Sequence, residues 1–352
     1  MKRRIFGVFA VLFAMFVFVV PLSAQNDNVV VVSDWGGTLA DAYRKSAFDD
    51  FEKLTGIKVV EVESTNNMAR IKAMVESNNV DTDLMEGSQA EINRFKDIGY
   101  LEVIDYAKFP AAVANGMTDI AKDKYGCGTF AYASVIAYRT DVFKKGSNPK
   151  SWKDFWDVKR FPGPRTIVSG SSGDYPPLEY ALLADGVAAK DLYPLDVDRA
   201  FKALDRIKPN VLKWWTSGSM AAQLLLNKEV VLAETFSGRI ADLKKKGVPV
   251  EIEWNQGMLN MDYWLMPKGA PHKDNAMKLL AYMTGAKQQA KFSELSGYGP
   301  VNIDAYKYIS PDVAANLPTA PDNIKKLIPV NNMYWSENMA KIQETWQEWE
   351  SK

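Results

Sequence analysis

Alternating strand and helix patterns run through most of the chain and constrain its fold more than any other feature. Residues 29–33 are β-branched, as strands favour, and 40–54 carries apolar residues at helical spacing up to Gly56. Further strands are expected over 57–62 and 82–85, and further helices over 68–76 and 89–98. Repeated units of this kind favour an α/β fold with largely parallel sheets flanked by helices.

A second lobe is indicated downstream. The composition shifts at 125–138, where the chain is expected to cross into that lobe, and Ser151 is placed to cap a helix. The chain is expected to return near 260–264, and an amphipathic helix follows Trp335. Ligands of layered α/β sheets bind beyond the carboxyl ends of the strands.

The first 24 residues have the pattern of a secretory signal peptide. Lys2, Arg3 and Arg4 precede an apolar run over 5–22, and Ala24 provides a small residue for cleavage. An uncleaved membrane anchor is the alternative. Because no cysteine stands at the junction, a lipoprotein anchor is not favoured. The sequence therefore predicts export to the periplasm, with cleavage near Ala24.

Charge and cysteine content exclude some partners and leave others open. The 43 basic and 43 acidic residues balance, which gives no reason to expect nucleic acid or an anionic membrane as a partner. Cys127 is the single cysteine, so an intramolecular disulfide is impossible, and we expect a buried, unreactive thiol.

Residues 230–302 combine a guanidinium (Arg239), a carboxylate (Asp262) and aromatic side chains near expected strand ends. Such a set can hold a small molecule that is cationic at one end and anionic at the other. Catalysis finds little support, since His272 is the only histidine and the common hydrolase and nucleotide motifs are missing. We expect no catalytic residue, no cofactor and no metal site.

Several segments, taken in order, carry a family resemblance. They are WGGTLADAYRKSAFDDFEKLTGIKV, IAYRTD, SWKDFWD, GSMAAQLLLNKEVVLAETFSGRI, MDYWLMPKGAPHKDNAMKLL, GYGPVN and LPTAPDN. Together they resemble the periplasmic solute-binding proteins of ABC importers, in the spermidine/putrescine-binding branch. The resemblance implies the type II fold: two α/β lobes with crossing strands as the hinge and a ligand cleft between them. On this basis, residues 25–133 and 263–352 form lobe 1, and residues 134–262 form lobe 2.

In the polyamine-binding relatives, aromatic rings enclose the methylene chain and carboxylates receive the ammonium groups. The expected ligand contacts in this chain are Trp35, Ser88, Asp174, Phe236, Arg239, Asp262 and Tyr298. Two aromatic positions depart from the family pattern, because Phe236 and Asn260 stand where tryptophan is usual. Only Asp174 could supply an acid from the loop SGSSGDYPP. A ligand with three or four charges would therefore keep unpaired buried charge, at several kcal/mol per ion.

Arg239 decides between two ligand classes. A guanidinium in the cleft would repel a polyamine and bind a carboxylate through its planar fork. With Asp262 for the ammonium, it would suit an ω-amino acid such as 4-aminobutyrate, which some relatives with an Arg–Asp arrangement bind. Alternatively, Arg239 is a solvated or interlobe ion-pair residue, and Asp262 a hinge or cap carboxylate.

The resemblance implies a receptor, not an enzyme, that presents an amine-bearing solute to a membrane permease as a monomer. A distinct alternative is a periplasmic sensor that passes ligand binding to a chemoreceptor or signalling partner.

Overall fold

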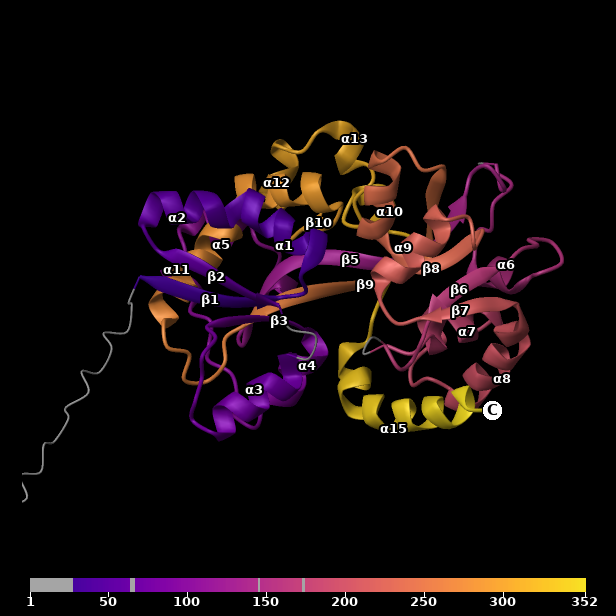
Figure 1. Cartoon of the computed structure of the whole chain (residues 1–352), viewed down its shortest axis with the longest axis horizontal. Coiled ribbons are helices and arrows are strands. Elements are labelled where there is room, and N and C mark those ends of the chain that lie inside the picture. The colour runs from indigo at the N-terminus through magenta and orange to yellow at the C-terminus, as the bar shows by residue number, and fades with distance from the viewer. Residues whose placement is uncertain (1–27, 64–66, 145, 173–174) are drawn as a thin grey trace, which may run out of the picture.

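Two long strands, β5 (Gly126–Arg139) and β9 (Val250–Leu265), run through both halves of the molecule and join them (Figure 1). They pair antiparallel from Cys127 opposite Trp264 to Arg139 opposite Val250. Nearly every residue of β5 is buried, as expected for a central strand with both faces covered. These are the crossing strands that the sequence predicted.

The computed structural model describes residues 28–63, 67–144, 146–172 and 175–352. The predicted signal segment, residues 1–24, lies outside this part of the chain. Among the described residues, no helix combines the length and apolar character needed to cross a membrane.

The first lobe is built on a parallel set of three strands. These are β1 (Val29–Asp34), β2 (Lys58–Glu63) and β3 (Leu84–Ser88). β1 lies between β2 and β3, and β3 pairs antiparallel with β9. Its helices are α1 (Gly37–Tyr43), α2 (Asp49–Thr55), α3 (Asn67–Glu76), α4 (Gln89–Lys96), α5 (Ala111–Gly116), α11 (Lys273–Met283) and α12 (Ala286–Ser296).

The second lobe repeats this plan. Its parallel strands are β6 (Arg165–Val168), β7 (Val211–Trp215) and β8 (Leu232–Phe236), with β6 in the middle and β8 antiparallel to β5. Its helices are α6 (Trp152–Trp156), α7 (Leu178–Ala184), α8 (Val197–Ile207), α9 (Gly218–Leu226) and α10 (Ser237–Lys245). The α/β fold is thereby confirmed, with a parallel set of strands in each lobe joined into one mixed sheet by the antiparallel pairing of β5 and β9.

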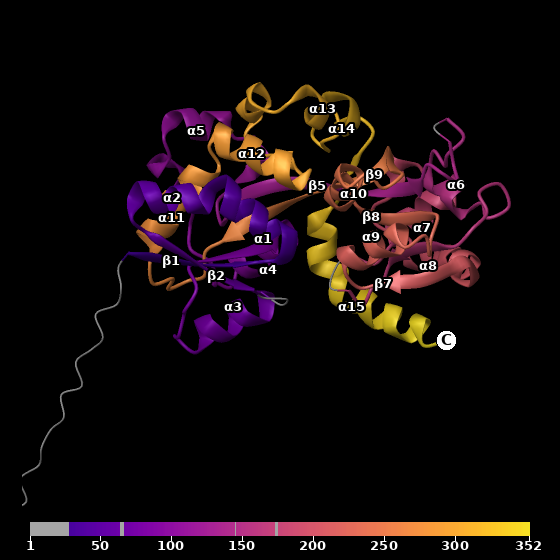
Figure 2. The same ribbon diagram turned by 45° about the horizontal axis from the view of Figure 1, so that its top comes forward.

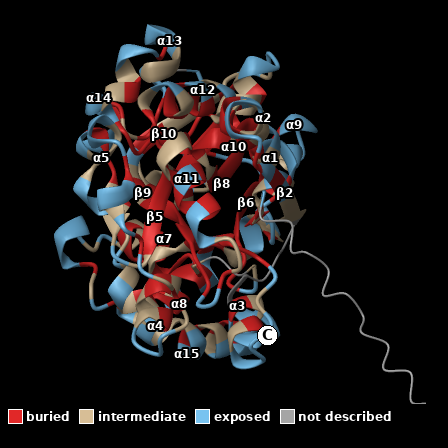
Figure 3. Cartoon of the chain, turned by 90° about the vertical axis from the view of Figure 1, so that its left-hand side faces the viewer, coloured by how far each residue is buried: buried red, intermediate tan, exposed pale blue. Residues whose placement is uncertain are grey.

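Short elements complete the described chain. They are β4 (Lys122–Asp123), β10 (Gly299–Pro300), β11 (Ile328–Pro329), α13 (Pro311–Ala314) and α14 (Pro321–Ile324), with 3-10 turns at Tyr106–Lys108, Asp119–Ala121, Ala189–Asp191, Lys208–Asn210 and Ile303–Lys307. Figure 3 shows the central strands buried and the outer faces of the helices exposed.

The predicted helix over 40–54 differs in detail. A π-helical turn at Arg44–Phe48 separates α1 from α2. Phe48 and Phe51 are buried, whereas Leu54 is 72% exposed. Gly56 ends the helix with φ 73°, the left-handed conformation that glycine adopts readily.

The last helix, α15 (Asn332–Glu350), corrects part of the predicted lobe division. Residues 263–352 were assigned to lobe 1, but α15 lies along the second lobe in both views (Figures 1 and 2). Trp335, Trp346 and Trp349 are buried in the same core as Trp152. Burial of these large rings fixes the helix there. The rest of the predicted division remains a prediction.

Candidate functional site

Trp35 and Asp262 meet at the edge of the first lobe that faces the second. Trp35 follows β1, and the left-handed Gly36 and Gly37 (φ 70° and 61°) turn the chain into α1. The Trp35 side chain is 37% exposed, and its Nε1 donates a hydrogen bond of 3.0 Å to Asp262 Oδ2. Asp262 stands opposite Ser88 of β3 and is 9% exposed. An indole ring and a carboxylate, both predicted as ligand contacts, thus lie together.

A second buried carboxylate supports this corner. Glu86 accepts hydrogen bonds from the Trp35 backbone N–H (2.9 Å) and from the Tyr43 hydroxyl. Burial, and next the charge of Asp262, raise the pKa of Glu86 well above its usual value. Asp34 adds further negative charge and accepts from the Gly36 N–H at 2.7 Å. Because the acids disfavour one another's ionisation, the corner favours a bound cation.

Arg239 lies across the lobe boundary from this corner. It belongs to α10, which begins directly after β8, and its Nη1 donates to Thr38 Oγ1 of α1 at 3.1 Å. Its Nε is buried and has no hydrogen-bond partner among the described residues. A buried unsatisfied donor is costly, so the guanidinium has capacity to bind an additional acceptor. Among the described residues, no hydrogen bond or ion pair joins Arg239 to Asp262: Arg239 bonds to Thr38, and Asp262 bonds to Trp35.

Two of the predicted aromatics pack against neighbouring rings. Tyr298 is 9% exposed and stacks on Phe130 with ring centroids 4.7 Å apart. Gly238 lies directly against the Tyr298 ring, since a Cβ there would come within 2.5 Å of it. Phe236 is half-buried, with its ring edge-on to Tyr132 at 5.5 Å. Tyr298 therefore lies at the contact between lobes.

Ser88 has a structural role in the first turn of α4, and its role as a ligand contact stays a prediction. Its Oγ accepts from the Glu91 N–H at 3.3 Å, and the Glu91 side chain accepts from the Ser88 N–H at 2.5 Å, forming a capping box at α4. The remaining predicted contact, Asp174, lies outside the described residues.

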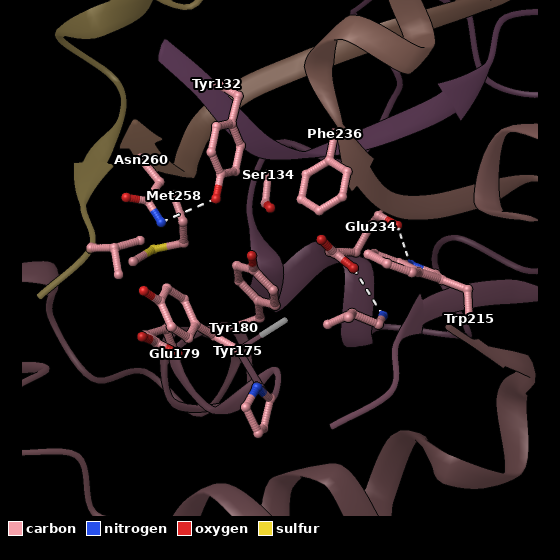
Figure 4. A pocket seen from close by; sticks show the side chains of 13 residues that line it. Tyr132, Ser134, Tyr175, Glu179, Tyr180, Trp215, Glu234, Phe236, Met258 and Asn260 are labelled. Carbon is pink, nitrogen blue, oxygen red and sulfur yellow. Dashed lines mark hydrogen bonds between the residues drawn. The ribbon is translucent and has the colours of Figure 1, made fainter. Parts of the chain in front are cut away.

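A cavity continues from Phe236 into the second lobe (Figure 4). It contains about 420 Å³ of space not filled by atoms, part of it open to solvent. The residues that line it are Tyr132, Ser134, Val168, Tyr175, Pro176, Glu179, Tyr180, Trp215, Glu234, Phe236, Met258, Asn260 and Val330. The wall combines apolar and aromatic side chains with a smaller number of hydroxyl, amide and carboxylate groups, as small-molecule sites commonly do.

The acids of this cavity are engaged by the protein. Glu234 accepts from the Val168 N–H at 2.9 Å. Glu179 accepts from the Tyr193 hydroxyl and Trp335 Nε1 at 2.7 and 2.6 Å. Burial raises the pKa of Glu179 to about 7. Among the described residues, no group of three or more metal-binding side chains gathers.

Sequence reasoning missed Tyr132, Tyr175 and Glu86 as parts of the site. Asn260 was noticed as a departure from the family pattern, and β5 places Tyr132 opposite it. Hydrophobic spacing identifies strands but not which residues face one another across them, so Tyr132 gave no usable signal.

Two α/β lobes joined by crossing strands, with polar and aromatic groups from both lobes at their boundary, define a cleft-type solute receptor. The chain belongs to the bacterial extracellular solute-binding protein family, whose model matches residues 46–321. The resemblance inferred from sequence is confirmed at this level, and the chain is a solute receptor of the periplasmic type.

Similar proteins include the gamma-aminobutyric acid-binding protein of Pseudomonas aeruginosa, 35% identical, covering 95% of this chain and 94% of the relative. The spermidine/putrescine-binding periplasmic protein 1 of Haemophilus influenzae is 26% identical, and the match covers 90% of this chain and 86% of the relative. Among solved structures, the Atu4243-GABA receptor is 35% identical with a TM-score of 0.83, covering 92% and 97% of the two chains.

Proposed function

We propose that this protein captures an ω-amino acid of the 4-aminobutyrate class for an ABC importer. Asp262 pairs with the ammonium group, and Arg239 pairs with the carboxylate. The observation that carries the proposal is the placement of Asp262 on the crossing strand β9, opposite Ser88 of the first lobe, and of Arg239 in α10 of the second lobe, with a buried Arg239 Nε available to an acceptor. Trp35, which donates to Asp262, presents an exposed ring for the aliphatic part of the solute.

Charge complementarity favours this class over polyamines. A diamine or triamine has no anionic group for Arg239, and a guanidinium near an ammonium raises the free energy of the complex. An ω-amino acid carries one charge of each sign, separated by methylene groups, and satisfies both residues. The greater identity to a 4-aminobutyrate-binding relative than to a spermidine/putrescine-binding one agrees with this choice.

The two-lobed arrangement supplies the mechanism. A solute that contacts Asp262 of the crossing strand and Arg239 of the second lobe binds the closed form more tightly than the open form. It therefore shifts the equilibrium toward closure. A bond between Arg239 and Thr38 already spans the lobes, and the solute carboxylate adds a second acceptor for the same guanidinium.

The protein acts as a non-catalytic, monomeric carrier that delivers its solute to a membrane permease after signal-peptide cleavage near Ala24. Ser88, Asp174, Phe236 and Tyr298 are further proposed contacts of the solute. A sensor role toward a chemoreceptor would use the same closure and remains the alternative.

Binding of a matched ligand set tests the proposal. Isothermal titration would compare 4-aminobutyrate with putrescine, which lacks the carboxylate, and with butyrate, which lacks the ammonium. We expect 4-aminobutyrate to bind best. Arg239→Ala should weaken it about 30-fold or more, the equivalent of about 2 kcal/mol, and should strengthen putrescine binding, because the variant removes the repulsion between the guanidinium and an ammonium group. Asp262→Asn should weaken 4-aminobutyrate comparably.

Arg160→Ala, which removes an exposed arginine of the same lobe, is the matched control and should leave every affinity unchanged. Preferential binding of putrescine, insensitive to Arg239→Ala, would restore the polyamine alternative. Failure of all amines to bind would reject both ligand classes.

A further inference from the structure

The first turn of α15 holds one wall of the cavity. Its residues Asn332 and Trp335 are three positions apart and therefore project from the same face of the helix. Both contact Tyr175, which lines the cavity. Neither Asn332 nor Trp335 is among the residues that line it, so both act from behind the wall.

Asn332 joins two side chains through its amide. Its Oδ1 accepts from the Tyr175 hydroxyl at 2.6 Å, and its Nδ2 donates to Asn260 Oδ1 at 3.2 Å. Asn260 Nδ2 in turn donates to the Tyr132 hydroxyl at 3.1 Å, the bond drawn in Figure 4. The resulting chain of hydrogen bonds links the loop before α7, α15, β9 and β5 along one side of the cavity.

Trp335 holds the aromatic ring of Tyr175. The two rings are stacked, with centroids 4.9 Å apart and planes inclined by 9°. Trp335 is itself fully buried, and its Nε1 donates to Glu179 at 2.6 Å. One helical turn thus holds both the ring and the hydroxyl of Tyr175, which removes rotamer freedom before any solute arrives.

An asparagine suits position 332 because its side chain offers a donor and an acceptor together. The Tyr175 hydroxyl donates to the Asn332 acceptor, and Asn260 Oδ1 accepts from the Asn332 donor. Asn260 Oδ1 also accepts from the Met261 N–H at 2.9 Å. A carboxylate at this position would supply only acceptors, and an apolar side chain would supply neither. The two roles are therefore separable by substitution.

We propose that Asn332 is a positioning residue for solute binding: it holds Tyr175 and Asn260 in the arrangement that the solute contacts. The inference rests on the proposed function and adds a determinant from the C-terminal helix. Asn332 does not touch the solute, and it acts through the two side chains that it orients.

Titration of 4-aminobutyrate and its longer homologue 5-aminovalerate into a set of variants tests this role. We expect Asn332→Ala to weaken 4-aminobutyrate binding about tenfold, as loss of a half-buried hydrogen-bonded group does, and to change the ratio of the two affinities. Asn332→Asp, which retains the acceptor for Tyr175, should lose less affinity for 4-aminobutyrate than Asn332→Ala does. Tyr175→Phe removes the same hydrogen bond, so combining it with Asn332→Ala should cost clearly less than the two separate losses multiplied.

Asn331→Ala is the matched structural control. Asn331 caps α15 by accepting from the Tyr334 N–H at 3.0 Å and has no part in the Tyr175 chain. This variant should lower the melting temperature of the ligand-free protein and leave both affinities within about twofold.

Three outcomes would overturn the inference. The first is an Asn332→Ala protein that melts earlier yet binds both solutes as the wild type does. The second is a double variant, Asn332→Ala with Tyr175→Phe, whose loss of affinity equals the product of the two separate losses. The third is a wild-type protein that binds neither solute, which would reject the proposed function and this inference with it.

Discussion

Replacement of Glu179 by glutamine should change how the stability of the protein depends on pH. Glu179 is 4% exposed, and burial raises its pKa from 4.5 to about 7. Because the folded-state pKa is the higher one, the folded protein binds this proton more tightly than the unfolded chain does. The resulting stabilisation is complete below about pH 4.5 and is lost as the pH rises through about 7.

The size of the effect follows from the two pKa values. The two pKa values differ by about 2.5. Because a pKa difference of 1 corresponds to about 1.36 kcal/mol, the difference in stability is about 3 kcal/mol. Glutamine retains the Oε1 acceptor used by Tyr193 and Trp335 but does not titrate. The wild type should therefore lose about 3 kcal/mol relative to Glu179→Gln between about pH 4.5 and pH 8.

Urea unfolding of the ligand-free protein, followed by tryptophan fluorescence at several pH values, measures this difference. Glu344→Gln, a change at an exposed position of α15, is the control and should give a pH profile parallel to that of the wild type. If the pH profile of Glu179→Gln also runs parallel to that of the wild type, the claim that Glu179 keeps its proton in the folded protein is refuted.

Other substitutions test other parts of the structure. Trp35→Phe keeps an aromatic ring but removes the donor to Asp262, so titration should show 4-aminobutyrate binding weakened about fivefold to tenfold; unchanged affinity would contradict the role of that bond. Gly170→Ala places a Cβ 2.5 Å from the buried Trp346 ring, and urea unfolding should show a loss of about 1–3 kcal/mol, whereas wild-type stability would show that the ring can shift freely. Burial raises the pKa of Cys127 to about 12, so maleimide should label it only after unfolding; rapid labelling of the native protein would argue against burial.

Local patterns predicted the fold well because they are set by nearby residues. The strand at 29–33 depends on side-chain spacing, and the end of the helix that follows it depends on Gly56. Both features are visible in the sequence. The placement of α15 depends instead on which core receives Trp346. An amphipathic helix does not identify its partner surface, so the sequence did not indicate that the tryptophans of α15 join the core of the second lobe.

The site was predictable where a residue follows a strand directly. Trp35 was identified in this way, whereas Asp262, which lies within β9, was identified from the family resemblance; the structure brings the two into hydrogen-bond contact. The pairing of Tyr132 with Asn260 depends on the register of two strands more than 100 residues apart. The role of Asn332 depends in addition on the docking of α15, which the sequence did not predict.

A crystal structure of the protein with 4-aminobutyrate would test the central claim most directly. We predict a closed cleft with the solute carboxylate about 3 Å from the Arg239 guanidinium and the ammonium group at Asp262, beside the Trp35 ring. A solute bound in the reverse orientation, or an Arg239 side chain that makes no contact with it, would contradict the account.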